Sequence, residues 1–116
     1  MVAQRYQDAS RRLLAQSREE LSRGDTQQAS EKGWGAAAQM FKAIAERRGW
    51  AHRGHRQIRV VASRLSDESA DPDIRRLYRV ASDLHTNFYE DLDTPNDVAA
   101  GLEDVATLLD KLQPLM

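Results

Sequence analysis

The sequence predicts an all-α protein: an antiparallel bundle of four to five helices in a single domain that spans residues 1–116. Two observations carry this prediction. Apolar residues recur three or four positions apart along most of the chain, and no segment alternates apolar and polar residues as a half-buried strand does. Residues that start and end helices interrupt this pattern at short intervals, and short connections favour antiparallel neighbours.

The first two helices are expected over residues 4–23 and 26–48. Gly24 suits the position just after a helix end, and Asp25 suits the N-cap of the next helix. The centre of the second helix, residues 33–41, carries no charge and is apolar on two faces. A helix of this kind is typical of the middle of a bundle. We therefore expect the second helix to pack against neighbours on both sides.

The third helix is expected to begin near Ala51 or His52 and to end near Asp67, with a loop over residues 66–72. At about 100° per residue, its apolar residues fall on one face and its arginines on the other. The face expected to be buried consists of Ile58, Val61, Ala62 and Leu65.

Two prolines mark the starts of the last helices. Asp71-Pro72 combines an N-cap with a first-turn proline for a helix that runs to about Asp91, and Thr94-Pro95 does the same for the fifth helix. The expected core stripe of the fourth helix is Ile74, Leu77, Ala81, Leu84, Phe88 and Leu92. That of the fifth is Val98, Leu102, Val105, Leu109 and Leu112.

Composition excludes several classes of protein. The hydrophobic fraction of 41% and the charged fraction of 30% fit a globular chain rather than a disordered one. There is no cysteine, which excludes disulfides and thiolate chemistry. No apolar run reaches the roughly 18 residues of a membrane-spanning helix, and the N-terminal segment has no signal-peptide core. We therefore expect a cytoplasmic protein with no membrane partner.

Charge is divided between the two parts of the chain. Residues 1–65 hold 13 basic and 6 acidic residues, whereas residues 66–116 hold 4 basic and 12 acidic residues. No acid lies between Glu46 and Asp67. The arginines of that stretch can neutralise phosphates, or they can meet an acidic surface of the same chain or of a partner chain. The sequence leaves both interpretations open.

The acid-free stretch contains a candidate ligand-binding or anion-binding site. The site consists of Arg48, His52, Arg53, His55, Arg56 and Arg59. Arginine, histidine and a helix N-terminus are suitable partners for an anion. Although two of the histidines are three residues apart, no cysteine or nearby carboxylate completes a metal-ligand set. We expect neither a metal nor a cofactor.

A candidate catalytic pair lies on the fourth helix. His85 can act as general base or acid on an RNA 2′-hydroxyl, and Arg79 can stabilise the charged phosphate. On a regular helix, however, six residues turn the chain about 600° and leave the two side chains about 120° apart. A packed edge of Tyr78, His85 and Tyr89 is the simpler interpretation. That edge is either a satisfied polar network or one wall of a small-ligand pocket in the bundle. The candidate pocket residues are Trp34, Trp50, Tyr78, Asn87 and Tyr89.

Four separated motifs resemble, in order, the HEPN-like bundles of the archaeal PaREP type and their bacterial relatives. The motifs are Gly24-Asp25, Ala29-x-Glu31-Lys32-x-Trp34-x-Ala36-Ala37, Arg48-Gly49-Trp50-x-His52-x-x-His55 and Ala81-x-x-Leu84-His85-x-Asn87-Phe88-Tyr89-Glu90. The resemblance covers about residues 20–110. It implies a bundle of four to five helices that is often a homodimer, and it implies no single activity.

Catalytically active HEPN ribonucleases carry Arg-x(4–6)-His, and Arg79 and His85 satisfy that spacing. The chain departs from the active pattern at two positions. Val80 follows the arginine where a polar residue is common, and Asn87 stands where toxin-type members have tyrosine. These departures favour a non-enzymatic relative of the ribonucleases.

Three functional hypotheses follow. The leading one is a non-enzymatic dimeric module that binds a nucleotide, a nucleic acid such as RNA, or a partner protein such as a nucleotidyltransferase. The second is a metal-independent ribonuclease of toxin type that uses Arg79 and His85. The third is a structural assembly protein, in which the oppositely charged halves mediate contacts between copies.

Overall fold

Five α-helices make up the computed structural model, which describes residues 1–116. There is no strand, so the prediction of an all-α bundle is confirmed. No helix of the structure has the length and apolar character needed to cross a membrane. The helices are α1 (Val2–Ser22), α2 (Thr26–Arg48), α3 (Gly54–Ser69), α4 (Pro72–Glu90) and α5 (Pro95–Leu112), followed by the short 3₁₀ helix η1 (Gln113–Leu115).

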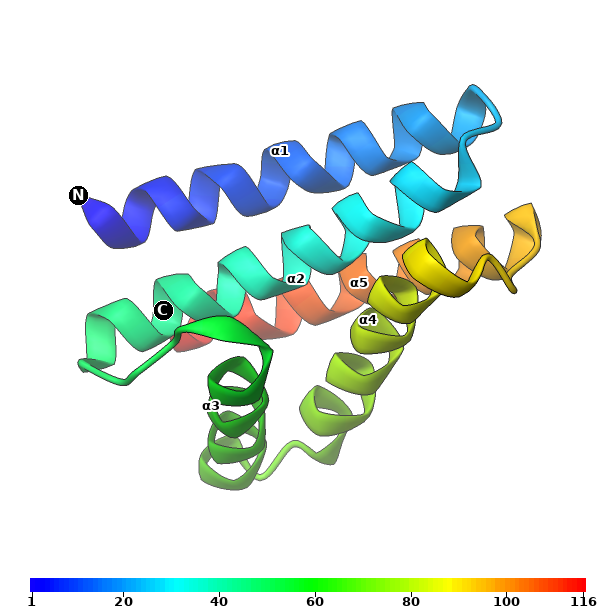
Figure 1. Ribbon diagram of the computed structural model, residues 1–116. Coiled ribbons are helices and arrows are strands. Elements are labelled where there is room, and N and C mark those ends of the chain that lie inside the picture. Colours follow the sequence, from blue (N-terminus) through cyan, green and yellow to red (C-terminus); the bar gives the residue numbers. More distant parts are fainter.

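The chain folds as two helical hairpins and a returning helix (Figure 1). The helices α1 and α2 run antiparallel along the length of the molecule. The helices α3 and α4 form the second hairpin, which lies across the first. Because that hairpin returns the chain to the end of the molecule where α2 begins, α5 runs alongside α2 in the same direction.

Helix α2 is the centre of the bundle, as its two apolar faces predict. It contacts each of the other four helices, and more of its residues are buried than in any other element. Close approach depends on glycine: a Cβ atom at Gly33 would lie 2.5 Å from Cδ2 of Leu102, and one at Gly101 would lie 2.9 Å from Cδ2 of Leu84. These two glycines let α2, α4 and α5 meet at one level of the core.

The predicted helix starts are confirmed at three caps. The Asp25 carboxylate accepts a hydrogen bond from the backbone of Gln28 at the start of α2, and Asp71 caps α4 in the same way. At the start of α5, Thr94 and Asp97 form a reciprocal capping box. Each cap pairs backbone N–H groups that have no partner inside the helix. Local sequence is therefore sufficient to define these boundaries.

The predicted boundaries of α3 are wrong at both ends. The helix begins at Gly54 rather than at Ala51 or His52, because Arg53 is extended and Gly54 has a φ of +64°. It also continues to Ser69, beyond the expected end near Asp67. The loop to α4 is short because Ala70 turns the chain with a φ of +55°.

Leu92 was expected in the core stripe of α4 and is instead 78% exposed. The helix ends at Glu90, and Asp91 adopts a left-handed conformation with a φ of +53°. The chain thereby leaves the helical path, and Leu92 no longer follows the buried face. The other residues of the predicted stripes of α3, α4 and α5 are buried, apart from Phe88, which is half-buried.

Candidate ligand-binding site

Five rings from three helices pack together at one edge of the bundle. Trp34 comes from α2, His55 from the first turn of α3, and Tyr78, His85 and Tyr89 from one face of α4. We call these five residues the His–aromatic cluster. The three side chains of α4 share a face of the helix. His85 follows Tyr78 by seven residues, which is about two turns, and Tyr89 follows His85 by four residues, which is about one turn.

The centroids of neighbouring rings in the His–aromatic cluster are 4.5–6.2 Å apart. The indole of Trp34 lies 4.5 Å from the His55 ring and 5.5 Å from the His85 ring, and the two imidazoles are 5.5 Å from each other. Trp34 and Tyr78 are buried, His85 is half-buried, and His55 and Tyr89 are exposed. One side of the cluster is therefore buried in the core, and the other side is exposed to solvent.

Glu31 on α2 fixes the orientation of His85. Its Oε1 lies 2.7 Å from Nδ1 of His85. A carboxylate oxygen can only accept a hydrogen bond, so Nδ1 is the nitrogen that donates. The Nε2 atom of His85 has no hydrogen-bond partner in the protein. This arrangement leaves Nε2 available to a ligand or a substrate.

His55 is held by a hydrogen bond between its Nε2 and Oγ of Ser82, 3.0 Å apart. Burial lowers the pKa of His55 below 6.5, and repulsion from His85 in its protonated form and from Arg59 lowers it further. Burial and both charges disfavour the protonated ring. The folded protein therefore favours the neutral ring of His55.

The hydroxyl of Tyr78 has no hydrogen-bond partner and is the single buried side-chain polar atom of the chain in that condition. Only 3% of the residue is exposed. Burial raises the pKa of Tyr78 above 10, and the neighbouring Arg59 and Ser82 side chains oppose that rise. The Ser82 side chain lies beside the hydroxyl of Tyr78, but the hydroxyl of Ser82 is hydrogen-bonded to His55 instead.

The structure divides the predicted anion-binding residues into two groups. His55 belongs to the His–aromatic cluster, and Arg59 lies one turn after it on α3. The exposed Arg53 and Arg56 are within two residues of His55 in the sequence and have no ion pair to an acid. The others are engaged elsewhere. Arg48 pairs with Glu68 at 2.7 Å and donates to the carbonyl of Leu115. His52 contacts Glu46 at 2.8 Å and packs its ring against Tyr6.

The predicted catalytic pair is not joined by any contact. His85 belongs to the His–aromatic cluster, whereas Arg79 is exposed and makes no side-chain hydrogen bond or ion pair. Both lie on the regular helix α4. The angular separation of about 120° that follows from helical geometry therefore applies to them.

The residues predicted to line one pocket lie at three different places in the structure. Trp34, Tyr78 and Tyr89 belong to the His–aromatic cluster. Asn87 is buried and structural: its amide donates to Oγ of Ser30, and its Oδ1 accepts hydrogen bonds from the backbone N–H groups of Leu92 and Asp93. It ties α2 to the turn that follows α4.

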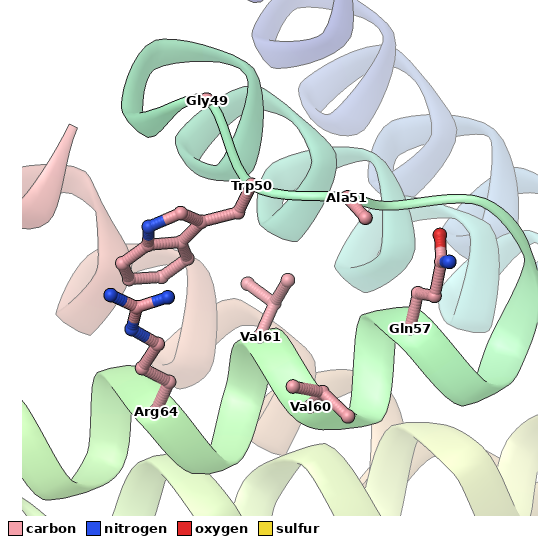
Figure 2. A pocket seen from close by; sticks show the side chains of 7 residues that line it. All are labelled: Gly49, Trp50, Ala51, Gln57, Val60, Val61 and Arg64. Atoms are coloured by element: carbon pink, nitrogen blue, oxygen red, sulfur yellow. The ribbon is translucent and has the colours of Figure 1, made fainter.

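Trp50 lies in a different place, a mostly apolar cleft of about 300 Å³ between the loop after α2 and α3 (Figure 2). The guanidinium of Arg64 stacks 4.0 Å from the indole centroid. Figure 2 shows Val60, Val61 and Gln57 of α3 along the floor of this cleft. The cleft is lined by Gly49, Trp50, Ala51, Gln57, Val60, Val61 and Arg64.

Two residues of this site were missed by the sequence analysis. Glu31 and Ser82 each hold one imidazole, yet they lie 54 and 27 positions from the histidines they contact. The available signal was that Glu31 stands three residues before Trp34, on the same side of α2. No three His, Asp or Glu side chains are grouped in a way that could hold a metal ion.

Comparison with known proteins gives one family and one fold. The model of the archaeal PaREP1/PaREP8 family matches residues 5–109. A crystal structure of a Sulfolobus solfataricus protein superimposes with a TM-score of 0.82 at 22% sequence identity, over 92% of this chain and 95% of that chain. At that identity the likeness concerns the fold alone. No curated protein matches the chain.

Proposed function

We propose that this chain, which belongs to the archaeal PaREP1/PaREP8 family, is a non-enzymatic module that binds single-stranded nucleic acid. One observation carries the proposal: three exposed arginines without acidic partners, Arg53, Arg56 and Arg59, lie at the start of α3, the helix that contributes His55 to the partly open His–aromatic cluster. Family membership agrees with the PaREP part of the resemblance seen in the sequence. The wider HEPN-like relationship remains part of this proposal.

Positive charge is available at Arg53, Arg56 and Arg59. Elsewhere the basic and acidic halves of the chain meet within the bundle, as in the pairs of Arg11 with Asp110 and of Arg18 with Glu103. The three arginines at the start of α3 make no such pair. Unpaired arginines on one surface can neutralise successive phosphates and release their counterions. This supports a polyanionic ligand.

Tyr89 supplies an accessible aromatic ring at the same edge. It is 69% exposed, and its ring packs edge-on against His85 at 5.3 Å and against Phe88 at 4.9 Å. These contacts restrain the ring without covering it. A restrained and exposed aromatic ring can stack on a nucleic-acid base, an interaction worth about 1–3 kcal/mol.

The proposal is tested by titrating the protein with fluorescent oligouridylate and oligothymidylate at low salt. The double variant Arg53→Glu/Arg56→Glu should bind more weakly than the wild type. Its plot of log affinity against log salt should be shallower by about 1.4, which is about 0.7 for each lost phosphate contact.

Arg12→Glu is the matched control, because Arg12 is an exposed arginine of α1 with no acidic partner. It should leave the affinity close to that of the wild type. The proposal fails if the wild-type protein binds neither oligonucleotide at low salt.

A second candidate function, a metal-independent ribonuclease, is favoured by the contact between Glu31 and His85. That contact holds the imidazole in one tautomer, as a general base requires. Because Arg79 and His85 of one chain do not meet, this candidate needs Arg79 of a second copy in the same cleft. Cleavage that persists unchanged in His85→Ala would eliminate it.

Assembly as a homodimer is a separate part of the proposal. The oppositely charged halves of the chain provide the attraction for such a contact, and charge attraction weakens as salt rises. Sedimentation at low and high salt tests it. A dimer that is insensitive to salt would argue against a charge-based interface. A partner protein such as a nucleotidyltransferase is the remaining alternative.

A further inference from the structure

Tyr78 carries a buried donor that nothing in the chain uses. Its hydroxyl is enclosed and makes no hydrogen bond, and the neighbouring Ser82 hydroxyl is bonded to His55 instead. A buried polar group without a partner destabilises the folded protein, whereas phenylalanine in the same place would not. Such groups are rare in folded proteins and call for a physical reason. The position of this hydroxyl at the His–aromatic cluster points to a ligand.

We propose that the hydroxyls of Tyr78 and Ser82, with the guanidinium of Arg59, form a seat for one phosphate of the bound nucleic acid. The inference rests on the proposed function and assigns a specific subsite to it. Tyr78 and Ser82 are four residues apart on α4, so their side chains lie one above the other. Arg59 follows His55 by four residues, so the two side chains share a face of α3, and α3 packs against α4. The charge of Arg59 lowers the pKa of both His55 and Tyr78.

His55 covers this seat. His55 is an exposed residue in the first turn of α3, its ring centroid lies 6.2 Å from that of Tyr78, and one hydrogen bond joins it to Ser82. When His55 moves away, the Ser82 hydroxyl is released and the Tyr78 hydroxyl is uncovered. A ligand oxygen then takes the place of the imidazole as the partner of both hydroxyls.

The groups around the seat select an anion. Two hydroxyls can donate, and the arginine supplies one positive charge and further N–H donors. The carboxylate of Glu31, which is bonded to the cluster, faces His85. Tyr89 lies further along α4, so a base joined to the seated phosphate can reach its exposed ring.

The experiment compares wild type, Tyr78→Phe and Ser82→Ala in binding to three probes: inorganic phosphate, AMP and an oligouridylate without terminal phosphates. Tyr78→Phe removes only the buried hydroxyl. We expect it to weaken binding of the oligonucleotide about tenfold, the cost of one hydrogen bond to a charged group. Its Tm should equal or exceed that of the wild type, because an unpaired buried group is lost.

Ser82→Ala should weaken binding by a similar factor, and it provides a second measurement if Tyr78→Phe fails to fold. Tyr6→Phe is the control, since Tyr6 lies next to His52 and away from the His–aromatic cluster. Competition by AMP that depends on Tyr78 would assign the seat to a terminal phosphate. Binding of the oligonucleotide alone would assign it to a phosphate within the chain.

Oligonucleotide binding by Tyr78→Phe and Ser82→Ala that equals the wild type would overturn the seat and leave the proposed function intact. A lower Tm of Tyr78→Phe with unchanged affinity would also overturn it, because the hydroxyl would then be structural. If the wild type itself binds no oligonucleotide, the proposed function and the seat fail together.

Discussion

Oε1 of Glu31 lies 2.7 Å from Nδ1 of His85, and this contact joins α2 to α4 at the surface edge of the His–aromatic cluster. Both side chains are about 30% exposed, so the contact is neither fully buried nor freely solvated. It fixes which imidazole nitrogen faces outward. The same contact therefore contributes to stability and to the chemistry available at the surface.

Glu31→Gln should lower the free energy of unfolding by about 0.5–1 kcal/mol, because a charge-assisted hydrogen bond becomes a neutral one and solvent screens part of the loss. Urea denaturation measures this change, and the ¹⁵N shifts of His85 should report a weaker preference for the tautomer with the proton on Nδ1. Glu19→Gln is the control, because that exposed glutamate of α1 has no side-chain partner. Equal effects of the two substitutions would contradict the assigned role of Glu31.

Asn87→Ala should lower the free energy of unfolding by about 2–3 kcal/mol, because the backbone N–H groups of Leu92 and Asp93 and the hydroxyl of Ser30 all lose a partner. Chemical denaturation measures the loss. Asn96→Ala provides the comparison, since Asn96 is exposed in the first turn of α5 and should cost little. A small loss for Asn87→Ala would mean that water replaces the amide.

Alanine substitutions at two glycines of α2 should have opposite effects. At Gly33 the new Cβ meets Leu102 at 2.5 Å in the core, so overpacking should cost about 1–2 kcal/mol after the gain in helix propensity. At Gly35 the nearest atom is Cδ1 of Leu13 at 3.3 Å, on a half-buried side chain.

Gly35→Ala should therefore be neutral or stabilising by about 0.5 kcal/mol. Thermal unfolding of both variants under one set of conditions gives the comparison. Stabilisation by Gly33→Ala would show that Leu102 moves aside without cost.

The pH dependence of stability should depend on His55. Its pKa is lower in the folded protein than the ordinary 6.5, because of burial and the charges of His85 and Arg59, while Tyr78 and Ser82 face it as neutral groups. As the pH falls through 6.5, the unfolded chain takes up a proton that the folded protein disfavours. Stability should therefore decrease toward acid pH.

Measurements of Tm against pH should show a smaller decrease in His55→Gln than in the wild type. The decrease should persist in His52→Gln, which removes a histidine outside the His–aromatic cluster. An identical pH profile in His55→Gln and the wild type would assign the decrease to other groups.

Local sequence was enough to predict most of the fold. The Asp25, Asp71 and Thr94 caps act through hydrogen bonds over two or three residues, and helical spacing defines the buried faces of α3, α4 and α5. Predictions failed where the backbone adopts φ values that composition does not reveal. Gly54 delays the start of α3, and Asp91 turns Leu92 out to solvent.

The sequence by itself thus determined the all-α class, the central place of α2 and the histidines and aromatic residues available for a site. Only the tertiary structure decided which of them meet. Gly33 and Gly101 allow α2, α4 and α5 to pack closely. The packing of α2, α3 and α4 brings Trp34, His55 and His85 together, while Trp50 and His52 lie elsewhere. The contacts of His55 with Ser82 and of His85 with Glu31 join residues that are 27 and 54 positions apart in the sequence. Such contacts depend on how the helices pack against one another, which the helical period alone does not specify.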